Sequence, residues 1–310
     1  MISVLAVLVA ALLFGTTGTA QALGPEDTTP LAVGVMRLVI GGTVLAGVSA
    51  LLARRHARTR ITPAPRAGTR AVLLMSATAV CLAVYQPLFF LGTARNGVAV
   101  GTVVALGSAP VLAGVLEWLL TRRRPSGIWL GATALATIGV VLLGFGGQEH
   151  SAGSAGTDAL GLLGSIGAGA SFAVIAVSQR RLLDGGWDPF TVVGAMGAGS
   201  AVIALAALPF VDVSWVAEPR GALMAAWLGI ATIVVAYGLF TWGLGGLTAA
   251  TAATLTLGEP LTASVLGLVA LGERLAPLAI AGLIVLAAGL VLLAAGSRAP
   301  RDLAPFAVEG

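Results

Sequence analysis

The sequence predicts an all-α polytopic membrane protein, with ten transmembrane helices arranged as two inverted repeats of five helices each. Of its 310 residues, 57% are hydrophobic and only 10% are charged, whereas a soluble domain has roughly 25% charged residues. Apolar runs of about 20 residues recur along the chain, and as helices they are long enough to cross a membrane. The fourth and fifth runs also resemble the last two, which indicates an internal duplication.

We expect ten membrane-spanning segments joined by short polar connections. They are Ile2–Leu23, Pro30–Leu52, Ala71–Ala94, Val98–Leu120, Ile128–Phe145, Ala159–Ser178, Pro189–Phe210, Ala222–Gly243, Thr248–Leu271 and Leu275–Ala295. The first segment has the apolar stretch and small-residue end of a secretory signal. No basic residue precedes it, although a signal has a positive n-region, so we interpret it as an uncleaved helix.

The duplication is clearest when Pro110 is placed on Pro260. The two stretches then align without a gap, and Arg124 falls on Arg274. A proline and a charged break in one register are stronger evidence than matching aliphatic residues. The expected divisions are an N-terminal repeat at 1–146, an extracytoplasmic linker at 147–158, a C-terminal repeat at 159–296 and a cytoplasmic tail at 297–310.

Arginines in the connections predict the orientation, because basic residues gather on the cytoplasmic side of membrane proteins. With both termini cytoplasmic, 13 of the 17 arginines lie in cytoplasmic connections or the tail, and three lie in outer connections. Five segments are an odd number, so the second repeat enters the membrane from the opposite face. Inverted repeats give two arrangements of similar energy, one open to each side, which is the structural basis of alternating access.

Several chemistries are excluded by what the sequence lacks. The chain has no lysine, so it has neither a Walker A loop nor a lysine Schiff base. Cys81 is the single cysteine, and His56 and His150 are far apart in sequence, so no metal-ligand spacing exists. We therefore expect no metal, no cofactor and no enzymatic activity. Nucleic acid is not an expected partner either, because most arginines lie between apolar runs.

Three ionisable side chains inside apolar segments need a reason, namely Glu259, Arg37 and Glu117. Each costs about 2.5–3.5 kcal/mol at the membrane centre on insertion scales. Glu259 precedes Pro260, which frees a carbonyl one turn back. Glu259 either binds a substrate amine or a coupling proton, or pairs with another polar group and fixes the helix. Arg37 either attracts a substrate carboxylate, pairs with Glu259, or extends to the headgroups.

Three weaker candidates bring hydrogen-bonding groups to about mid-membrane, namely Tyr85, Gln86 and Tyr237. Hydrogen bonding between helices is the alternative for each. Pro87, Pro110 and Pro260 are the expected helix-kink positions.

Other polar and aromatic residues are given structural interpretations. Glu117 is an interfacial carboxylate balanced by Arg122 or Arg124. Tryptophans near the expected interfaces are belt anchors. They are Trp118, Trp129, Trp187 and Trp215.

The C-terminal half has a recognisable ending, in which Glu259-Pro260 is followed by Leu271-Gly272-Glu273-Arg274-Leu275 and a glycine-bearing last segment. It resembles the drug/metabolite transporter superfamily, in particular its EamA-type branch. The N-terminal half is similar to the partner unit of that family through Phe14-Gly15, Arg37 and Pro110. The likeness covers almost the whole chain. It differs at Arg122-Arg123-Arg124, where the first half of the family often has Gly-Glu-Arg.

The resemblance implies export of small metabolites, amino acids or drugs, through a central cavity between segments 1–4 and 6–9. We predict a secondary transporter of the inner or plasma membrane, with both termini cytoplasmic. Its expected partners are the lipid bilayer, a small-molecule substrate and, as a candidate, a coupling proton; a homodimer is an open alternative to a monomer. An uncoupled facilitator or exchanger is the alternative within transport, and a membrane-embedded scaffold is the alternative outside it.

Overall fold

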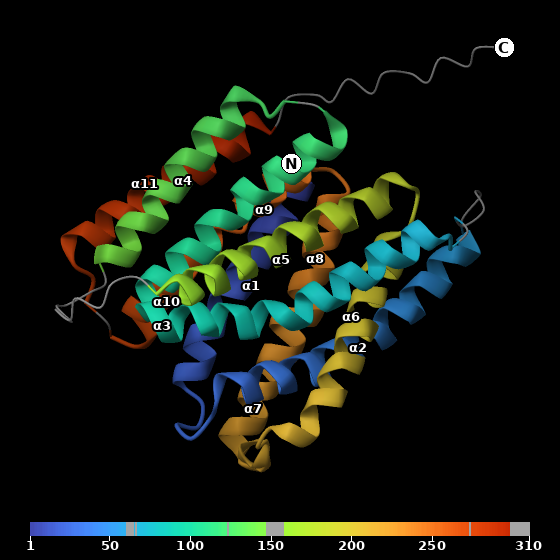
Figure 1. Cartoon of the computed structure of the whole chain (residues 1–310), viewed down its shortest axis with the longest axis horizontal. Helices are drawn as coiled ribbons and strands as arrows, with labels where there is room; N and C mark the ends of the chain where they lie inside the picture. Colours follow the sequence, from blue (N-terminus) through green and yellow to red (C-terminus); the bar gives the residue numbers. More distant parts are fainter. Residues whose placement is uncertain (60–64, 66, 123, 147–157, 273, 298–310) are drawn as a thin grey trace.

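The computed structural model describes residues 1–59, 65, 67–122, 124–146, 158–272 and 274–297. These residues form helices and turns without a strand (Figure 1). The α-helices are α1 (Ile2–Ala22), α2 (Pro30–Thr59), α3 (Thr69–Thr121), α4 (Gly127–Gly146), α5 (Ala159–Asp184), α6 (Pro189–Ala207), α7 (Pro219–Gly229), α8 (Ala236–Leu244), α9 (Ala249–Leu255), α10 (Gly258–Ala270) and α11 (Pro277–Gly296). A π-helical turn at Ile230–Val235 joins α7 to α8, and 3-10 turns at Leu208–Phe210 and Ser214–Ala217 follow α6.

Nine helical segments of the described chain are long and apolar enough to cross a membrane, which confirms the all-α polytopic class. The 53-residue α3 contains two of the ten expected segments, 71–94 and 98–120. Its backbone leaves the helical region at Gly97, where φ is 81° and ψ is 157°. Glycine adopts such a conformation far more readily than other residues, so Gly97 kinks α3 between its two halves. The count of ten crossings stays a prediction.

The segment expected as one helix at 248–271 is interrupted, because Thr256 and Leu257 separate α9 from α10. Pro260 explains the break, since it has no N–H to donate to the Thr256 carbonyl four residues back. That carbonyl accepts the Glu259 N–H instead, at 2.9 Å. Pro260 therefore lies in the first turn of α10, where a missing N–H removes no helical hydrogen bond. Pro87 and Pro110 lie inside α3, whose non-helical backbone is at Gly97 instead.

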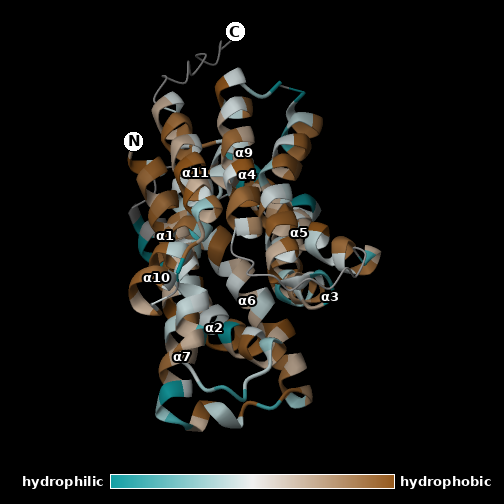
Figure 2. Ribbon diagram, turned by 90° about the vertical axis from the view of Figure 1, so that its left-hand side faces the viewer, coloured by the Kyte–Doolittle hydropathy of each residue, from teal (hydrophilic) through white to brown (hydrophobic). Residues whose placement is uncertain are grey.

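The helices pack in pairs that are distant in sequence. Figure 1 shows α4 beside α11 at one edge of the molecule and α2 beside α6 at another. Between these pairs, α3 packs along α5, and α1 packs against both α8 and α10. The largest buried cluster includes Phe14, Phe172, Ile175, Tyr237 and Phe240. Hydrophobic residues run along most of the helices (Figure 2), and many large hydrophobic side chains are exposed, as helices in contact with lipid require.

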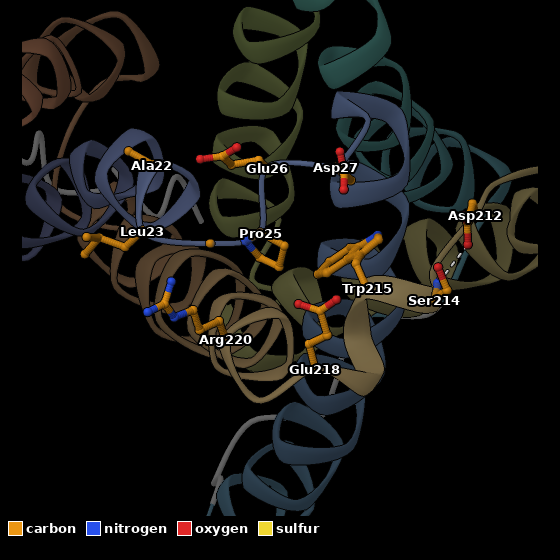
Figure 3. Close-up of a pocket in the computed structure, with 11 residues that line it drawn as sticks. Ala22, Leu23, Pro25, Glu26, Asp27, Asp212, Ser214, Trp215, Glu218 and Arg220 are labelled. Atoms are coloured by element: carbon orange, nitrogen blue, oxygen red, sulfur yellow. Dashed lines mark hydrogen bonds between the residues drawn. The ribbon is translucent and has the colours of Figure 1, made fainter.

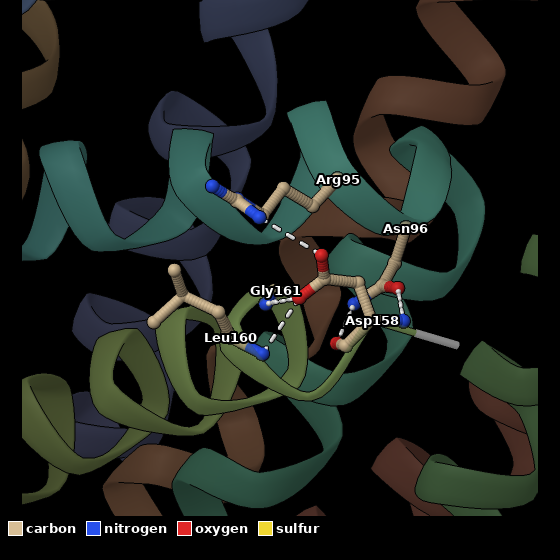
Figure 4. Close-up of polar contacts among 5 residues, drawn as sticks. All are labelled: Arg95, Asn96, Asp158, Leu160 and Gly161. Atoms are coloured by element: carbon tan, nitrogen blue, oxygen red, sulfur yellow. Dashed lines mark hydrogen bonds and ion pairs between the residues drawn. The ribbon is translucent and has the colours of Figure 1, made fainter. Parts of the chain in front are cut away.

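Polar contacts tie the connections together at both ends of α5. At its N-terminus, Asp158 caps the helix and pairs with Arg95 of α3 at 2.9 Å (Figure 4). Asn96 exchanges two further hydrogen bonds with the Asp158 backbone. The hydrogen bond from Arg95, together with the Gly161 N–H, lowers the pKa of the Asp158 carboxyl. This cluster joins the kinked middle of α3 to the start of α5.

Near the C-terminal end of α5, Arg180 holds the connection between α8 and α9. Its Nη1 donates to the carbonyl oxygens of Leu244, Gly245 and Leu247 at 2.7, 2.9 and 2.9 Å. The same guanidinium pairs with Asp184 one turn further on, at 2.6 Å. Each group of contacts joins two connections that are expected on the same side of the membrane, the outer side for Arg95 with Asp158 and the inner side for Arg180 with the α8–α9 connection.

Some expected features lie outside the described residues. They are Glu273, Arg123, His150, the linker apart from Asp158 and the tail apart from Ser297.

Candidate functional site

Five polar side chains chosen from the sequence lie together among α2, α3, α8 and α10, and we call them the central cluster. They are Arg37, Tyr85, Gln86, Tyr237 and Glu259. Arg37 donates from Nη1 to Gln86 Oε1 at 3.3 Å. Arg37 also interacts electrostatically with Glu259, Tyr85 and Tyr237, and Tyr85 interacts with Glu259 and Tyr237. Four helices therefore supply one polar region within the apolar segments.

Arg37 and Glu259 have opposite charges but do not form a direct ion pair. The ion pairs within 4.0 Å among the described residues are Arg95–Asp158 and Arg180–Asp184. Arg37 Nε is buried without a hydrogen-bond partner, and the Glu259 carboxylate accepts no hydrogen bond from another described residue. An N–H buried without an acceptor costs about 1–3 kcal/mol. Both half-buried side chains therefore keep hydrogen-bonding capacity for a further molecule.

The backbone places Glu259 at the N-terminal end of α10, within its first turn. This end of a helix carries the positive part of the helix dipole and unpaired N–H groups, so it favours a carboxylate. The break between α9 and α10 creates this helix end inside an apolar segment. Pro260 was expected to free a carbonyl one turn back. That carbonyl, of Thr256, instead accepts the Glu259 N–H, and the polar feature at this place is the start of α10.

Aromatic rings and a close backbone approach enclose the cluster. The Tyr237 ring lies edge-on to Phe14, with ring centroids 5.0 Å apart, and Tyr85 stacks on Phe89 at 6.2 Å. A Cβ added to Gly15 would lie 2.6 Å from the Glu259 carbonyl oxygen. The Phe14-Gly15 pair therefore lets α1 contact the first turn of α10 directly.

Two buried polar networks were missed by sequence reasoning. Gln179 of α5 is fully buried and accepts a hydrogen bond from Thr241 Oγ1 of α8 at 2.9 Å. Trp129 Nε1 of α4 donates to Thr254 Oγ1 of α9 at 3.1 Å, and the Thr133 and Thr254 hydroxyls are 2.9 Å apart. Gln179 directly follows the segment expected at Ala159–Ser178, so a glutamine at the end of that segment was a usable signal for the first network. Threonines are too common in apolar helices to indicate the second.

Some structural interpretations need correction. Glu117 accepts the Ala250 N–H at the start of α9, at 2.8 Å, and it does not pair with Arg122 or Arg124 among the described ion pairs. Trp129 and Trp215 are only 7% and 5% exposed, so they are packed inside the protein and are not belt anchors. The sequence gives the distance of a residue from a helix end but not the direction of its side chain.

A second polar region is a pocket of about 800 Å³ between the α1–α2 connection and residues 212–220 (Figure 3). Its ionisable lining residues are Glu26, Asp27, Asp212, Glu218 and Arg220. The backbone N–H of Ser214 donates to Asp212 and lowers the pKa of its carboxyl. The pocket shares no residue with the central cluster, and its excess of carboxylates makes it negative. Among the described residues, no group of three or more His, Cys, Asp and Glu side chains could hold a metal ion.

The fold and the central cluster define a class, namely polytopic membrane proteins with a polar site inside the bilayer, beside an interrupted helix. The sequence model of the EamA-like transporter family matches residues 1–145 and 159–295. The chain belongs to this transporter family and thus to the drug/metabolite transporter superfamily. Both the resemblance and the membrane class expected from the sequence are confirmed.

Two known proteins are similar over nearly the full chain. The "Uncharacterized transporter YwfM" of Bacillus subtilis (strain 168) is 39% identical over 292 residues, which cover 94% of this chain and 93% of that protein. A protein of known crystal structure has the same fold, with a TM-score of 0.74 at 19% sequence identity. The match covers 96% of this chain and 97% of that one.

Proposed function

We propose that this transporter exports a small zwitterionic metabolite, of the amino acid class, across the inner or plasma membrane. The observation that carries the proposal is the pair of opposite charges in the central cluster, Arg37 and Glu259, which interact without a direct ion pair. An amino acid has one carboxylate and one ammonium group on the same carbon. Its carboxylate would bind Arg37 and its ammonium group would bind Glu259.

Energetics support a substrate that neutralises both charges. A guanidinium and a carboxylate within the membrane are each unfavourable by about 2.5–3.5 kcal/mol on insertion scales. The unpartnered Nε of Arg37 adds to this. A bound zwitterion would supply an acceptor to Arg37 and donors to Glu259, with the side chains of Tyr85, Gln86 and Tyr237 as neutral hydrogen-bonding groups beside it.

Contacts between helices support alternating access through inverted repeats at 1–146 and 159–296. If the two halves of α3 count as segments 3 and 4, then α4–α11 and α2–α6 are pairs of equivalent segments from the two repeats. The packing of α1 against α8 and α10 corresponds in the same way to the packing of α5 against α3. A two-fold relation between the halves accounts for these pairings.

The direction and the driving force belong to the same proposal. Export and cytoplasmic termini are the expectations that the family and the arginine distribution favour. Glu259 is the carboxyl group that would exchange a proton for the substrate ammonium group. Proton movement would then drive export against a substrate gradient.

Flux into proteoliposomes tests the proposal. The purified protein is reconstituted, and uptake of labelled amino acids is measured with and without an imposed pH gradient. We expect saturable flux that the gradient raises, and flux at least tenfold lower for both Arg37→Gln and Glu259→Gln. Glu26→Gln makes the same chemical change as Glu259→Gln on an exposed carboxylate outside the cluster, and it should transport normally.

Each other outcome has a definite meaning. Saturable flux that ignores the gradient would indicate the uncoupled facilitator or exchanger. Normal flux in both cluster variants would refute the assigned site. If no amino acid is transported while other small solutes are, the zwitterion proposal is wrong.

A further inference from the structure

An apolar groove lies on the outer surface between the second half of α3 and α4, apart from the central cluster. Its volume is about 490 Å³. Its lining residues are Val111, Gly114, Val115, Trp118, Pro125, Trp129, Leu130, Thr133, Ala134, Thr137 and Ile138. Val111, Leu130 and Ile138 are each about half exposed, so the groove is open on the side that faces lipid. Hydrocarbon is the chemistry that fits this lining.

Two arginines lie at the end of the groove where α3 passes into α4. Arg122 directly follows α3 as its C-cap, and Arg124 directly precedes Pro125, which lines the groove. Both side chains are exposed. The exposed Trp118 lines the same end of the groove, and tryptophan is enriched at the level of lipid headgroups. The groove therefore combines an apolar channel with positive charge at its headgroup end.

Arg122 stands in a backbone conformation that an arginine adopts only at a cost. Its φ is 58°, and it is the one described non-glycine residue with a positive φ. In the alignment of Pro110 with Pro260, position 122 corresponds to Gly272, whose φ is 68°. The second half of the chain thus fills the same left-handed position with glycine, which adopts it freely.

The corresponding face of the second half is built differently. Thr133 and Ala134 of the groove correspond to Leu283 and Ile284, which are larger and fully apolar. At other lining positions the second half has smaller side chains, since Trp118 and Trp129 correspond to Leu268 and Ala279. It has glycine where the first half has Arg122, whereas Arg124 has an arginine counterpart in Arg274. The first half therefore combines the apolar groove with two described arginines, Arg122 and Arg124, at its end.

From this combination we propose that the groove binds one anionic phospholipid, with an acyl chain along α3 and α4 and the phosphate between Arg122 and Arg124. Arginine is suited to phosphate because its guanidinium donates several N–H groups in a fixed plane. The floor of the groove includes Trp129, which donates to Thr254 of α9. A lipid in this place would thus contact the side chain that holds the helix preceding the central cluster. This proposal is independent of the identity of the substrate.

Native mass spectrometry of the detergent-solubilised full chain tests the proposal, with phosphatidylglycerol and phosphatidylcholine as matched probes. We expect wild-type protein to retain phosphatidylglycerol at least tenfold more strongly than phosphatidylcholine. The double variant Arg122→Gly, Arg124→Gln should lose this preference while folding normally, because glycine suits the backbone of position 122. The substitution Ala134→Ile, at an exposed position of the groove, leaves all charges unchanged and introduces the side chain of the aligned Ile284. It should narrow the groove and weaken the retention of both lipids.

The control variant Arg54→Gln, Arg55→Gln removes two exposed arginines from the end of α2 and should retain the preference for phosphatidylglycerol. An equal loss in this control would show general attraction to positive connections and would overturn the proposal. Undiminished phosphatidylglycerol retention in both groove variants would also overturn it. If the double arginine variant does not fold, Ala134→Ile and the control still decide the question.

Discussion

Arg37 and Glu259 show how single residues can retain binding capacity inside a membrane protein. A direct ion pair would satisfy both groups and leave little for a substrate. The structure instead gives Arg37 one neutral partner, Gln86, and leaves its Nε without an acceptor. Glu259 is held near Arg37 by the start of α10 and not by a hydrogen bond of its carboxylate. The two charges are therefore positioned by their helices, which is the arrangement that a preorganised site requires.

Glu259→Gln should separate the functional role of this carboxylate from a structural one. Glutamine has nearly the same size, so we expect a near-normal yield of folded protein. It has no charge and cannot release a proton, so transport should fall at least tenfold, which corresponds to about 1.4 kcal/mol. Size-exclusion chromatography and proteoliposome flux measure the two effects. Full flux with normal yield would contradict the role proposed for Glu259.

Gly15→Ala tests the contact between α1 and the first turn of α10. The added methyl group would lie 2.6 Å from both the Glu259 carbonyl oxygen and Thr262 Cβ. Such overpacking typically costs about 1–3 kcal/mol, so we expect a lower melting temperature and reduced flux. Gly18→Ala is the matched control in the same helix, because its Cβ would meet nothing within 4 Å. The control should melt at or above the wild-type temperature; equal behaviour of the two variants would refute this close contact.

The members of the central cluster could be predicted from the sequence because they are polar residues in apolar segments. Their convergence could not be, since it depends on how α2, α3, α8 and α10 rotate against one another. Gln179 follows the same polar-in-apolar rule but lay just past the expected end of its segment at Ser178. Trp129 was misplaced for a related reason, because a position near a helix end does not say whether the ring faces lipid or protein.

At the scale of elements, two helix interruptions, the α9–α10 break and the kink of α3 at Gly97, determine where the polar residues and the groove lie. The cause of the α9–α10 break, Pro260, was visible in the sequence, but the form of the break was not. The helix is interrupted at Thr256 and Leu257, where the Thr256 carbonyl accepts the Glu259 N–H in place of the N–H that Pro260 lacks. Gly97 has a similar effect in α3, where it separates the half that holds Tyr85 and Gln86 from the half that lines the groove. Apolar run lengths alone identify the spans but not these breaks.

The contact between Arg95 and Asp158 should show a defined pH dependence. Asp158 caps α5 and has a lowered pKa, first because Arg95 donates to it and then because the Gly161 N–H does. A lowered pKa in the folded state means that the stabilisation is fully present above the ordinary aspartate pKa of about 3.9. It is lost only as the pH falls through the lowered value.

Asp158→Asn tests this sign. Asparagine can still cap α5 but cannot pair with Arg95, so the variant should melt below wild type. The difference should be constant from pH 8 to pH 5 and shrink in stronger acid, and it should decrease with added salt because the pair is partly exposed. Thermal unfolding in detergent at several pH values measures it. A difference that already falls between pH 8 and pH 5 would contradict the assignment.

At the scale of the whole molecule, contacts at the membrane faces agree with the parity of the predicted segments. Arg95 with Asp158, and the pocket shared by residues 22–27 and 212–220, join connections assigned to the outer side. Arg180 with the α8–α9 connection, and Glu117 with Ala250, join connections assigned to the inner side. All four contacts join connections that the arginine distribution assigns to the same side of the membrane. These contacts agree with the predicted five segments in each repeat.

If the two repeats are inverted, as we propose, equivalent positions face opposite sides of the membrane, and two exposed arginines make this testable. Arg124 and Arg274 are aligned when Pro110 is placed on Pro260, and both are exposed. Cys81 is the single cysteine of the chain, so Cys81→Ala gives a cysteine-free background. In it, Arg274→Cys should react with a membrane-impermeant maleimide on intact cells, and Arg124→Cys should react only after the membrane is permeabilised.

The comparison is matched, because each variant removes one arginine from the same place in its repeat. Labelling of both positions from one side would mean that the repeats are parallel. The two halves could not then exchange conformations to open a central site first to one side of the membrane and then to the other. Labelling from opposite sides but in the reverse sense would keep the inversion and turn the molecule over, so that the 13 arginines assigned to the inner side would face outward. Such a result would oppose the positive-inside rule, so the expected pattern ties orientation and inversion to a single measurement.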